Sequence, residues 1–183
     1  MEYERIREVA ARLGEIPEAA KVEISDGSII MMMSPSGTHE LIAMRVARQL
    51  NQQLDGDLVA HTGGDVEHPG LGILRRPDVV VLPESAMDTP GSWEASLLEL
   101  VGEVVSPSNF ANDYQQKLRD YPAMGIPLYL LIDPRTAVIS VLSDPGPGPD
   151  GPRYRARHDY TFGDKVSVGR WHLDSRELPR YRQ

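Results

Sequence analysis

The sequence predicts a mixed α/β or α+β domain, in which helices pack on a mixed sheet. Two observations lead to that class. Segments with apolar residues at helical spacing alternate with short apolar runs bounded by Gly, Pro, Asn and Asp, and their order along the chain is helix, strands, helix, strands. Because 183 residues with a hydrophobic fraction of 40% suffice for one buried core, residues 1–183 are predicted to form a single domain.

The first third of the chain is predicted to hold a short helix, a β-hairpin and a longer helix. Residues 2–13 carry apolar side chains at helical spacing, and Gly14 ends that helix. Residues 21–33 are predicted to form two strands joined at Asp26-Gly27, a dipeptide typical of hairpin turns. After a short turn with capping residues, a helix is expected over residues 38–54.

Three strands are expected in the middle of the chain. Residues 58–66 form the first, which Gly63-Gly64 interrupts, and residues 77–82 form the second. Residues 97–105 form the third. The second and third strands matter most for function because each carries an acidic residue beside or within its apolar run.

The helix that follows has the clearest boundaries in the chain. It is expected over residues 109–124, with Ser108 or Asn109 as its N-cap. Gly125 lies just past its end, and Pro127 prevents its continuation. The sequence therefore predicts a helix directly after the strand that carries Glu103.

The C-terminal part is predicted to be largely β-structure. Residues 128–142 are expected to form a hairpin. Residues 143–152 are rich in Pro and Gly, which favours a mobile loop. Residues 153–183 are then expected to add C-terminal strands to the same core.

Composition predicts a cytoplasmic protein and limits its interactions. The chain has no cysteine, its acidic N-terminus lacks the features of a signal peptide, and no apolar run approaches the ~20 residues of a membrane helix. A net charge of −8 repels polyanions unless basic residues cluster or a metal recharges the site. This argues against promiscuous DNA binding, and less strongly against a nuclease, because bound divalent metals can be the largest local charges.

Two carboxylates on neighbouring strands are the first candidate functional residues. Asp78 opens an apolar run after Pro77, and Glu103 interrupts the apolar run 101–105. If the two strands pair, both side chains can reach one divalent cation. Asp78 could instead be a strand-start cap and Glu103 a surface residue, but a surface role does not suit Glu103 in a mid-sheet strand, where an unpaired charge is costly.

Lys117 is the third candidate. It falls in the middle of the apolar stripe expected on the helix over residues 109–124. Its ammonium either reaches past the stripe to water or meets the two carboxylates and the scissile phosphate, where it would stabilise the transition state. Asp113, four residues earlier, could pair with it. The stripe consists of Phe110, Tyr114, Leu118, Tyr121 and Met124.

Short motifs spread over most of residues 20–142 carry a family resemblance. They are VEISDG (22–27), SPSGTH (34–39), RPDVVV (76–81), EVVSPS (103–108), KLRDY (117–121), GIPLY (125–129) and IDP (132–134). In these motifs the chain resembles the bacterial Uma-two family of putative restriction endonucleases, which belongs to the PD-(D/E)XK nuclease superfamily. The motifs are specific when taken together, whereas each alone is weak.

The resemblance implies a restriction-endonuclease-like α/β core with an N-terminal β-hairpin. It also implies that Asp78 and Glu103 are metal ligands and that Lys117 is the catalytic lysine, moved from the strand onto the helix. Val105 stands where the superfamily pattern places that lysine, so the nuclease hypothesis depends on Lys117.

Two further residues, Glu23 and His39, match polar positions of the family. Glu23 could be an extra ligand or base, and His39 a proton carrier or phosphate contact. The alternatives are an exposed strand residue for Glu23 and an ordinary helix N-terminal residue for His39.

Together these observations predict a cytoplasmic endonuclease that hydrolyses phosphodiester bonds in DNA with Mg²⁺ or Mn²⁺. The expected partner is nucleic acid, with DNA as the first choice and no membrane, and a homodimer is compatible with the sequence. A catalytically silent binding or regulatory protein with the same fold is the alternative, which the net charge of −8 favours.

Overall fold

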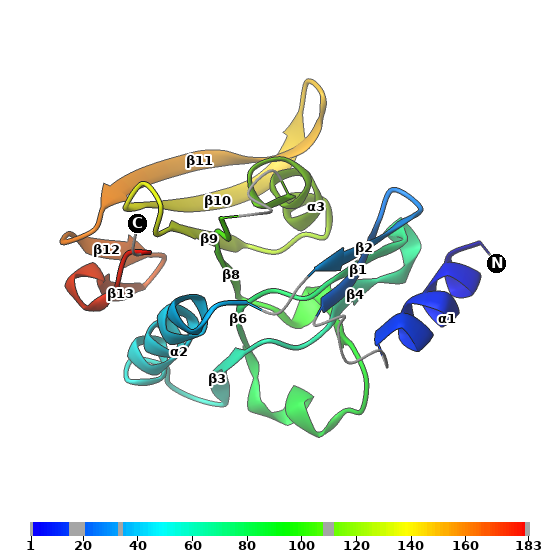
Figure 1. The fold of residues 1–183 in the computed structure, drawn as a ribbon, viewed down its shortest axis with the longest axis horizontal. Helices are drawn as coiled ribbons and strands as arrows, with labels where there is room; N and C mark the ends of the chain where they lie inside the picture. Colours follow the sequence, from blue (N-terminus) through cyan, green and yellow to red (C-terminus); the bar gives the residue numbers. More distant parts are fainter. Residues whose placement is uncertain (1, 15–20, 33–34, 108–111, 182–183) are drawn as a thin grey trace.

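The computed structural model describes residues 2–14, 21–32, 35–107 and 112–181. Within them it has a mixed α+β architecture, as the sequence predicted, with helices packed on mixed sheets (Figure 1). No helix in this part of the chain is long and apolar enough to span a membrane. The helices are α1 (Glu2–Gly14), α2 (Gly37–Asn51) and α3 (Lys117–Ala123).

The central sheet has six strands in the order β11-β10-β9-β8-β6-β3. Its neighbours are antiparallel except β8 and β9, which are parallel. Helix α2 packs on one face and α3 on the other, so each face has its own apolar cluster. The strands are β3 (Leu58–Thr62), β6 (Val79–Pro83), β8 (Leu100–Val104), β9 (Leu128–Asp133), β10 (Val138–Gly148) and β11 (Gly151–Thr161).

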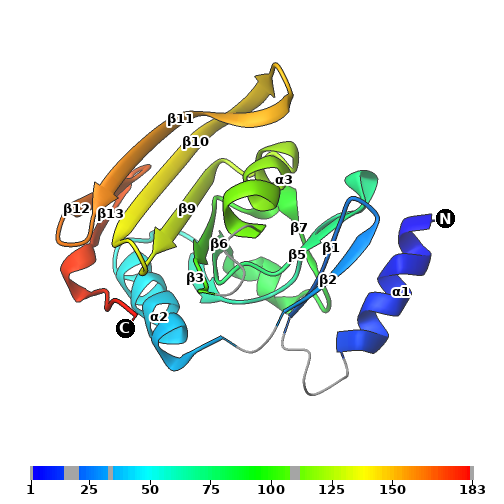
Figure 2. The ribbon, with the colours of Figure 1, turned by 45° about the horizontal axis from the view of Figure 1, so that its top comes forward.

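A smaller sheet has the order β2-β1-β5-β4-β7, and α1 packs against it (Figure 2). A third, two-stranded sheet, β12-β13, packs against α2 in the apolar cluster on that face of the central sheet. The strands are β1 (Lys21–Ser25), β2 (Ser28–Met32), β4 (Val66–His68), β5 (Ile73–Arg75), β7 (Trp93–Glu94), β12 (Lys165–Val168) and β13 (Trp171–Asp174).

The chain passes from the small sheet to the central sheet at residues 76–78. Arg75 ends β5, and Asp78 immediately precedes β6. A second crossing, at Gly63-Gly64, lies beside it, because the Gly63 N–H donates to the Asp78 carbonyl at 3.0 Å. Both glycines have positive φ angles, of 77° and 99°, which glycine adopts without steric cost. Charged side chains of the small sheet therefore lie next to the acids of the central sheet.

The predicted hairpin at residues 21–33 is confirmed for the part described. Strands β1 and β2 pair from Lys21 with Met32 to Ser25 with Ser28. Asp26 and Gly27 both have positive φ angles, of 50° and 68°, as a two-residue hairpin turn requires.

The prediction of a loop over residues 143–152 is wrong. Residues 143–148 continue β10 and residues 151–152 begin β11, and the antiparallel register is the same on both sides of Asp144. Figures 1 and 2 show this hairpin projecting from the sheet. Beyond Ser143, β10 no longer pairs with β9, so Pro145 and Pro147 lie in a ribbon with an open edge, where a missing N–H costs no ladder bond.

In its described part, the helix predicted over residues 109–124 is not α-helical throughout. Residues 112–116 form a π-helical turn, and the α-helical part starts only at Lys117. Its end agrees with the sequence, because Met124 is the C-cap and Gly125 follows with a φ of 77°. The expected N-cap, Ser108 or Asn109, and Phe110 lie outside the described residues.

Candidate active site

Asp78 and Glu103 lie opposite each other on neighbouring strands. Strands β6 and β8 pair Val79 with Gly102, and the Asp78 N–H donates to the Gly102 carbonyl at 3.0 Å, which continues the register by one step to Glu103. Opposed side chains of an antiparallel pair lie on the same face. Only 6% of Asp78 and 1% of Glu103 is exposed. Both line one cavity of about 790 Å³.

The Asp78 carboxylate is surrounded by positive and hydrogen-bonding groups. Its Oδ2 accepts a hydrogen bond of 2.8 Å from the Val104 N–H. The Lys21 ammonium, at the start of β1, pairs with Oδ1. Burial alone would raise the pKa of Asp78, but Lys21 and His39 hold it well below its ordinary value. This carboxylate is therefore ionised, and Lys21 already supplies a cation beside it.

Glu103 is held from helix α3. Its Oε1 lies 2.8 Å from the Lys117 ammonium and accepts a hydrogen bond from the Tyr121 hydroxyl. Lys117 and Tyr121 are four residues apart, so one face of the helix presents both groups to the strand. Burial raises the pKa of Glu103 above its ordinary value, and Lys117 offsets only part of that effect.

Lys117 is a buried cation among carboxylates, and 2% of it is exposed. Besides Glu103, its ammonium lies 3.0 Å from Asp113 Oδ1 and 3.7 Å from Glu23 Oε1. Burial works against the ammonium form, but these carboxylates keep the pKa of Lys117 well above its ordinary value. The alternative of a lysine that reaches past the apolar stripe to water is therefore wrong.

Glu23 is fully buried rather than an exposed strand residue. Its Oε2 lies 2.7 Å from Arg75 Nη1, and its Oε1 accepts a hydrogen bond of 3.0 Å from the Arg76 N–H. Burial raises the pKa of Glu23, but Lys117 and Arg75 lower it below its ordinary value overall. Both Glu23 oxygens therefore have donors, and Oε1 also lies 3.7 Å from the Lys117 ammonium.

His39 lies at the same cavity, 5% exposed, in the first turn of α2. Ser36 caps that helix by accepting the His39 N–H at 3.3 Å, which fixes the start of the helix. The ring Nε2 lies 2.9 Å from Asp78 Oδ2. Among the described residues, this Nε2 is the buried side-chain nitrogen that has no hydrogen bond. Nδ1 lies 3.4 Å from the Tyr181 hydroxyl.

Arg75 is the most important residue that the sequence did not single out. It is fully buried, and its guanidinium joins Glu23 to Asp120, with Nε 3.1 Å from Asp120 Oδ2. Asn112, in the π-helical turn, accepts a further bond of 3.1 Å from Nη1. Because Arg75 is followed by Arg76 on a short strand, the sequence pattern does not single it out. Its position in the site becomes clear only from the pairing of β5 with β1.

Lys21 and Tyr181 were missed for the same reason. Lys21 is the first residue of β1, and the residues around it show no pattern that indicates a functional site. Tyr181 is near the end of the chain, yet its hydroxyl donates to the Val105 carbonyl at 3.1 Å and lies at the cavity. Both contacts join residues far apart in sequence.

The donor set fits a hard divalent cation. Asp78 and Glu103 supply carboxylate oxygens from adjacent strands, and the His39 Nε2 without a hydrogen bond points to a group still to be satisfied there. In the described part of the chain no group of three or more His, Asp or Glu side chains is arranged to hold a metal. Mg²⁺ is commonly held by one or two carboxylates, with water and substrate phosphate as its other ligands, so two protein carboxylates suffice.

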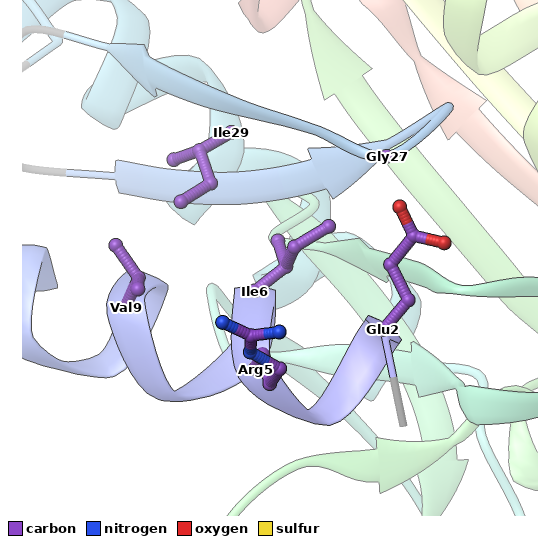
Figure 3. Close-up of a pocket in the computed structure, with 6 residues that line it drawn as sticks. All are labelled: Glu2, Arg5, Ile6, Val9, Gly27 and Ile29. Carbon is purple, nitrogen blue, oxygen red and sulfur yellow. The ribbon is translucent and has the colours of Figure 1, made fainter.

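A second groove lies away from these residues, between α1 and the β1-β2 hairpin. Figure 3 shows Ile6 and Val9 on the helix side and Ile29 on the strand side, with Glu2 and Arg5 on the same helix. Its volume is about 550 Å³. None of the five predicted site residues lines it, so the candidate active site is the cavity with the carboxylates.

Comparisons with known proteins agree with this fold. A family model described as "Uma2: Putative restriction endonuclease" matches residues 2–171. The crystal structure of a putative nuclease belonging to DUF820 from Anabaena variabilis ATCC 29413 is similar, with a TM-score of 0.68 and 17% sequence identity, over 92% of this chain and 96% of that chain. At that identity the likeness concerns the fold alone. No curated protein matches this chain.

Proposed function

The chain belongs to the Uma2 family of putative restriction endonucleases, and we propose that it is a metal-dependent endonuclease that hydrolyses phosphodiester bonds in DNA. One observation carries the proposal. Asp78 and Glu103 oppose each other on adjacent strands in one cavity, and the Lys117 ammonium lies 2.8 Å from Glu103. Two carboxylates and a lysine in one cavity match the needs of phosphodiester hydrolysis.

Each residue has a distinct proposed role. Asp78 and Glu103 would hold Mg²⁺ or Mn²⁺, which when bound activates water and polarises the phosphate. Lys117 would stabilise the negative charge that develops on the phosphate, since its position is fixed by three carboxylates. Glu23 orients Lys117, and His39 lies close enough to Asp78 to contact a phosphate or move a proton.

Local charge offsets the acidity of the whole molecule. The net charge of −8 disfavours a polyanion at long range. At the cavity, however, Lys21 and Lys117 are both buried or nearly so and both lie against the acids. Adding a divalent cation there would make the site positive. Nucleic acid would thus be attracted to the cavity rather than to the general surface.

A catalytically silent protein with the same fold is the second candidate. Two observations favour it, the net charge of −8 and the pairing of Asp78 with Lys21, which satisfies that carboxylate without a metal. Such a protein would neither bind a divalent metal at this site nor catalyse a reaction. The two candidates therefore differ in a directly measurable way.

The test is cleavage of circular nucleic acids by the purified protein. Circular substrates are used because only an endonuclease can cut them. We expect circular plasmid DNA or circular single-stranded DNA to be cut with Mg²⁺ or Mn²⁺ and left intact in EDTA. Structured RNA, assayed alongside, tests the choice of DNA. Asp78→Asn protein purified in the same way controls for contaminating nucleases. A parent protein that cuts none of these substrates with either metal would favour the silent candidate.

A further inference from the structure

Two of the three lysines in this chain lie at the candidate active site. Lysine occurs at positions 21, 117 and 165, and the other basic residues of the 19 are arginines. Lys117 lies on Glu103, Lys21 lies on Asp78, and Lys165 is exposed on β12. Lysine is a point charge on a flexible stem, so its ammonium changes partners more readily than a planar guanidinium. The proposed mechanism uses Lys117 and leaves Lys21 without a role.

The Lys21–Asp78 ion pair lies between two cavities. The cavity of about 790 Å³ also contains Glu103 and Lys117, where the scissile phosphate would lie. A smaller cavity of about 180 Å³ has Lys21 and Asp78 in its lining as well. Lys21, with 15% of its side chain exposed, thus faces the reaction centre on one side and a second compartment on the other.

The smaller cavity contains a second cation, Arg76. Its side chain is 44% exposed, and its Nε lies 3.7 Å from Asp65 Oδ1, which is too long for a hydrogen bond. Glu40, exposed on α2, is the opposing charge in the lining. With Asp78 neutralised by a metal, the lining cations Lys21 and Arg76 outnumber the lining carboxylate Glu40. Asp65 lies outside the lining, 3.7 Å from Arg76, so an anion in this compartment competes with Asp65 for the guanidinium.

We propose that this smaller cavity binds the backbone phosphate next to the scissile one, with Arg76 and Lys21 as its cationic contacts. The proposal rests on the proposed nuclease function and adds the path of the substrate strand past Asp78. Lys21 can leave Asp78 only when another cation neutralises that carboxylate, so its ammonium becomes available to the phosphate in the metal-loaded protein. Substrate binding and metal binding are thereby linked through one side chain.

The test compares a substrate that has neighbouring phosphates with one that has none. A pool of labelled oligodeoxynucleotides of random sequence is the first, and bis(p-nitrophenyl) phosphate is the second. Arg76→Gln should lower the ratio of kcat/KM on the oligonucleotides to kcat/KM on the small diester by roughly tenfold to a hundredfold, the range for one charge-assisted hydrogen bond. The loss should fall mainly on KM, and the salt dependence of kcat/KM on oligonucleotides should weaken by about 0.7 in log–log slope.

Two matched variants sharpen the result. Glu40→Gln removes the opposing carboxylate of the cavity, so the same ratio should rise. Arg5→Gln deletes the same charge as Arg76→Gln, but on the exposed surface of α1, and should leave the ratio at the parent value.

Calorimetry of Mn²⁺ binding tests Lys21 without any reaction. Lys21→Met should tighten Mn²⁺ binding, because no ammonium then competes for Asp78 Oδ1, and should lower the substrate ratio as Arg76→Gln does. This proposal alone would be overturned if the parent protein is active and Arg76→Gln leaves the ratio of the two kcat/KM values unchanged. It would also be overturned if Lys21→Met leaves the Mn²⁺ affinity unchanged. A parent protein that hydrolyses neither substrate and binds no Mn²⁺ would overturn the proposed function and this proposal together.

Discussion

Replacing Lys117 with Met lowers the rate of DNA cleavage by roughly 10²–10³-fold, the usual effect of removing one transition-state contact. Mn²⁺ affinity stays at the parent value or rises, because Lys117→Met removes a positive charge 2.8 Å from Glu103. Methionine keeps the length of the side chain and fills the same space. Cleavage at saturating Mn²⁺ and calorimetry of Mn²⁺ binding measure the two effects separately.

Lys165→Met is the matched control for this prediction. It makes the same chemical change at an exposed position on β12, outside the cavity, and should leave cleavage and metal binding at the parent values. Urea unfolding of both variants shows whether lost activity reflects lost structure. Cleavage by Lys117→Met at the parent rate, at equal metal occupancy, would reduce Lys117 to a structural residue.

Replacing Arg75 with Met lowers the free energy of unfolding by about 3–5 kcal/mol, the cost of leaving a buried charge without its partner. The guanidinium and the Glu23 carboxylate are both fully buried, and their closest atoms are 2.7 Å apart. Without Arg75, Glu23 and Asp120 lose a shared cation at the contact between the small sheet and α3. Urea denaturation at neutral pH measures the change.

Arg48→Met is the control, because it removes an ion pair of the same length at the surface. Arg48 lies 2.7 Å from Glu177, but the two side chains are 59% and 48% exposed. Such a pair contributes at most about 1 kcal/mol. A triple variant, Arg75→Met with Glu23→Gln and Asp120→Asn, should regain part of the lost stability. Equal losses in Arg75→Met and Arg48→Met would contradict the importance assigned to the buried cluster.

Much of the fold could be predicted from local patterns. The hairpin at Asp26-Gly27 and the end of α3 at Gly125 both follow from residues that adopt positive φ angles. The ribbon of residues 143–152 could not be predicted in this way. Composition indicates only how well a segment can pack in a core. Pro145 and Pro147 are tolerated because β10 extends beyond the end of its pairing with β9, which depends on the sheet and not on local sequence.

The predicted acids and lysine meet at one cavity, but the groups that hold them were not foreseen. Glu103 and Lys117 were found because a charge inside an apolar run or stripe needs a partner. Arg75, Lys21 and Tyr181 give no such signal, since their neighbours in sequence are unremarkable and their contacts are long-range. The roles of Asp78, Glu103, Lys117, Glu23 and His39 are predictions that mutagenesis has to test.

The most direct test of the proposed function is calorimetric titration of the protein with Mn²⁺. We expect the parent to bind Mn²⁺, and Asp78→Asn and Glu103→Gln each to lose that binding while remaining folded, because each variant removes one carboxylate ligand and keeps the side-chain volume. Asp144→Asn, which changes an exposed carboxylate on the projecting hairpin, should bind as the parent does. Parent-like Mn²⁺ binding by both Asp78→Asn and Glu103→Gln would contradict the metal site and, with it, the proposed mechanism.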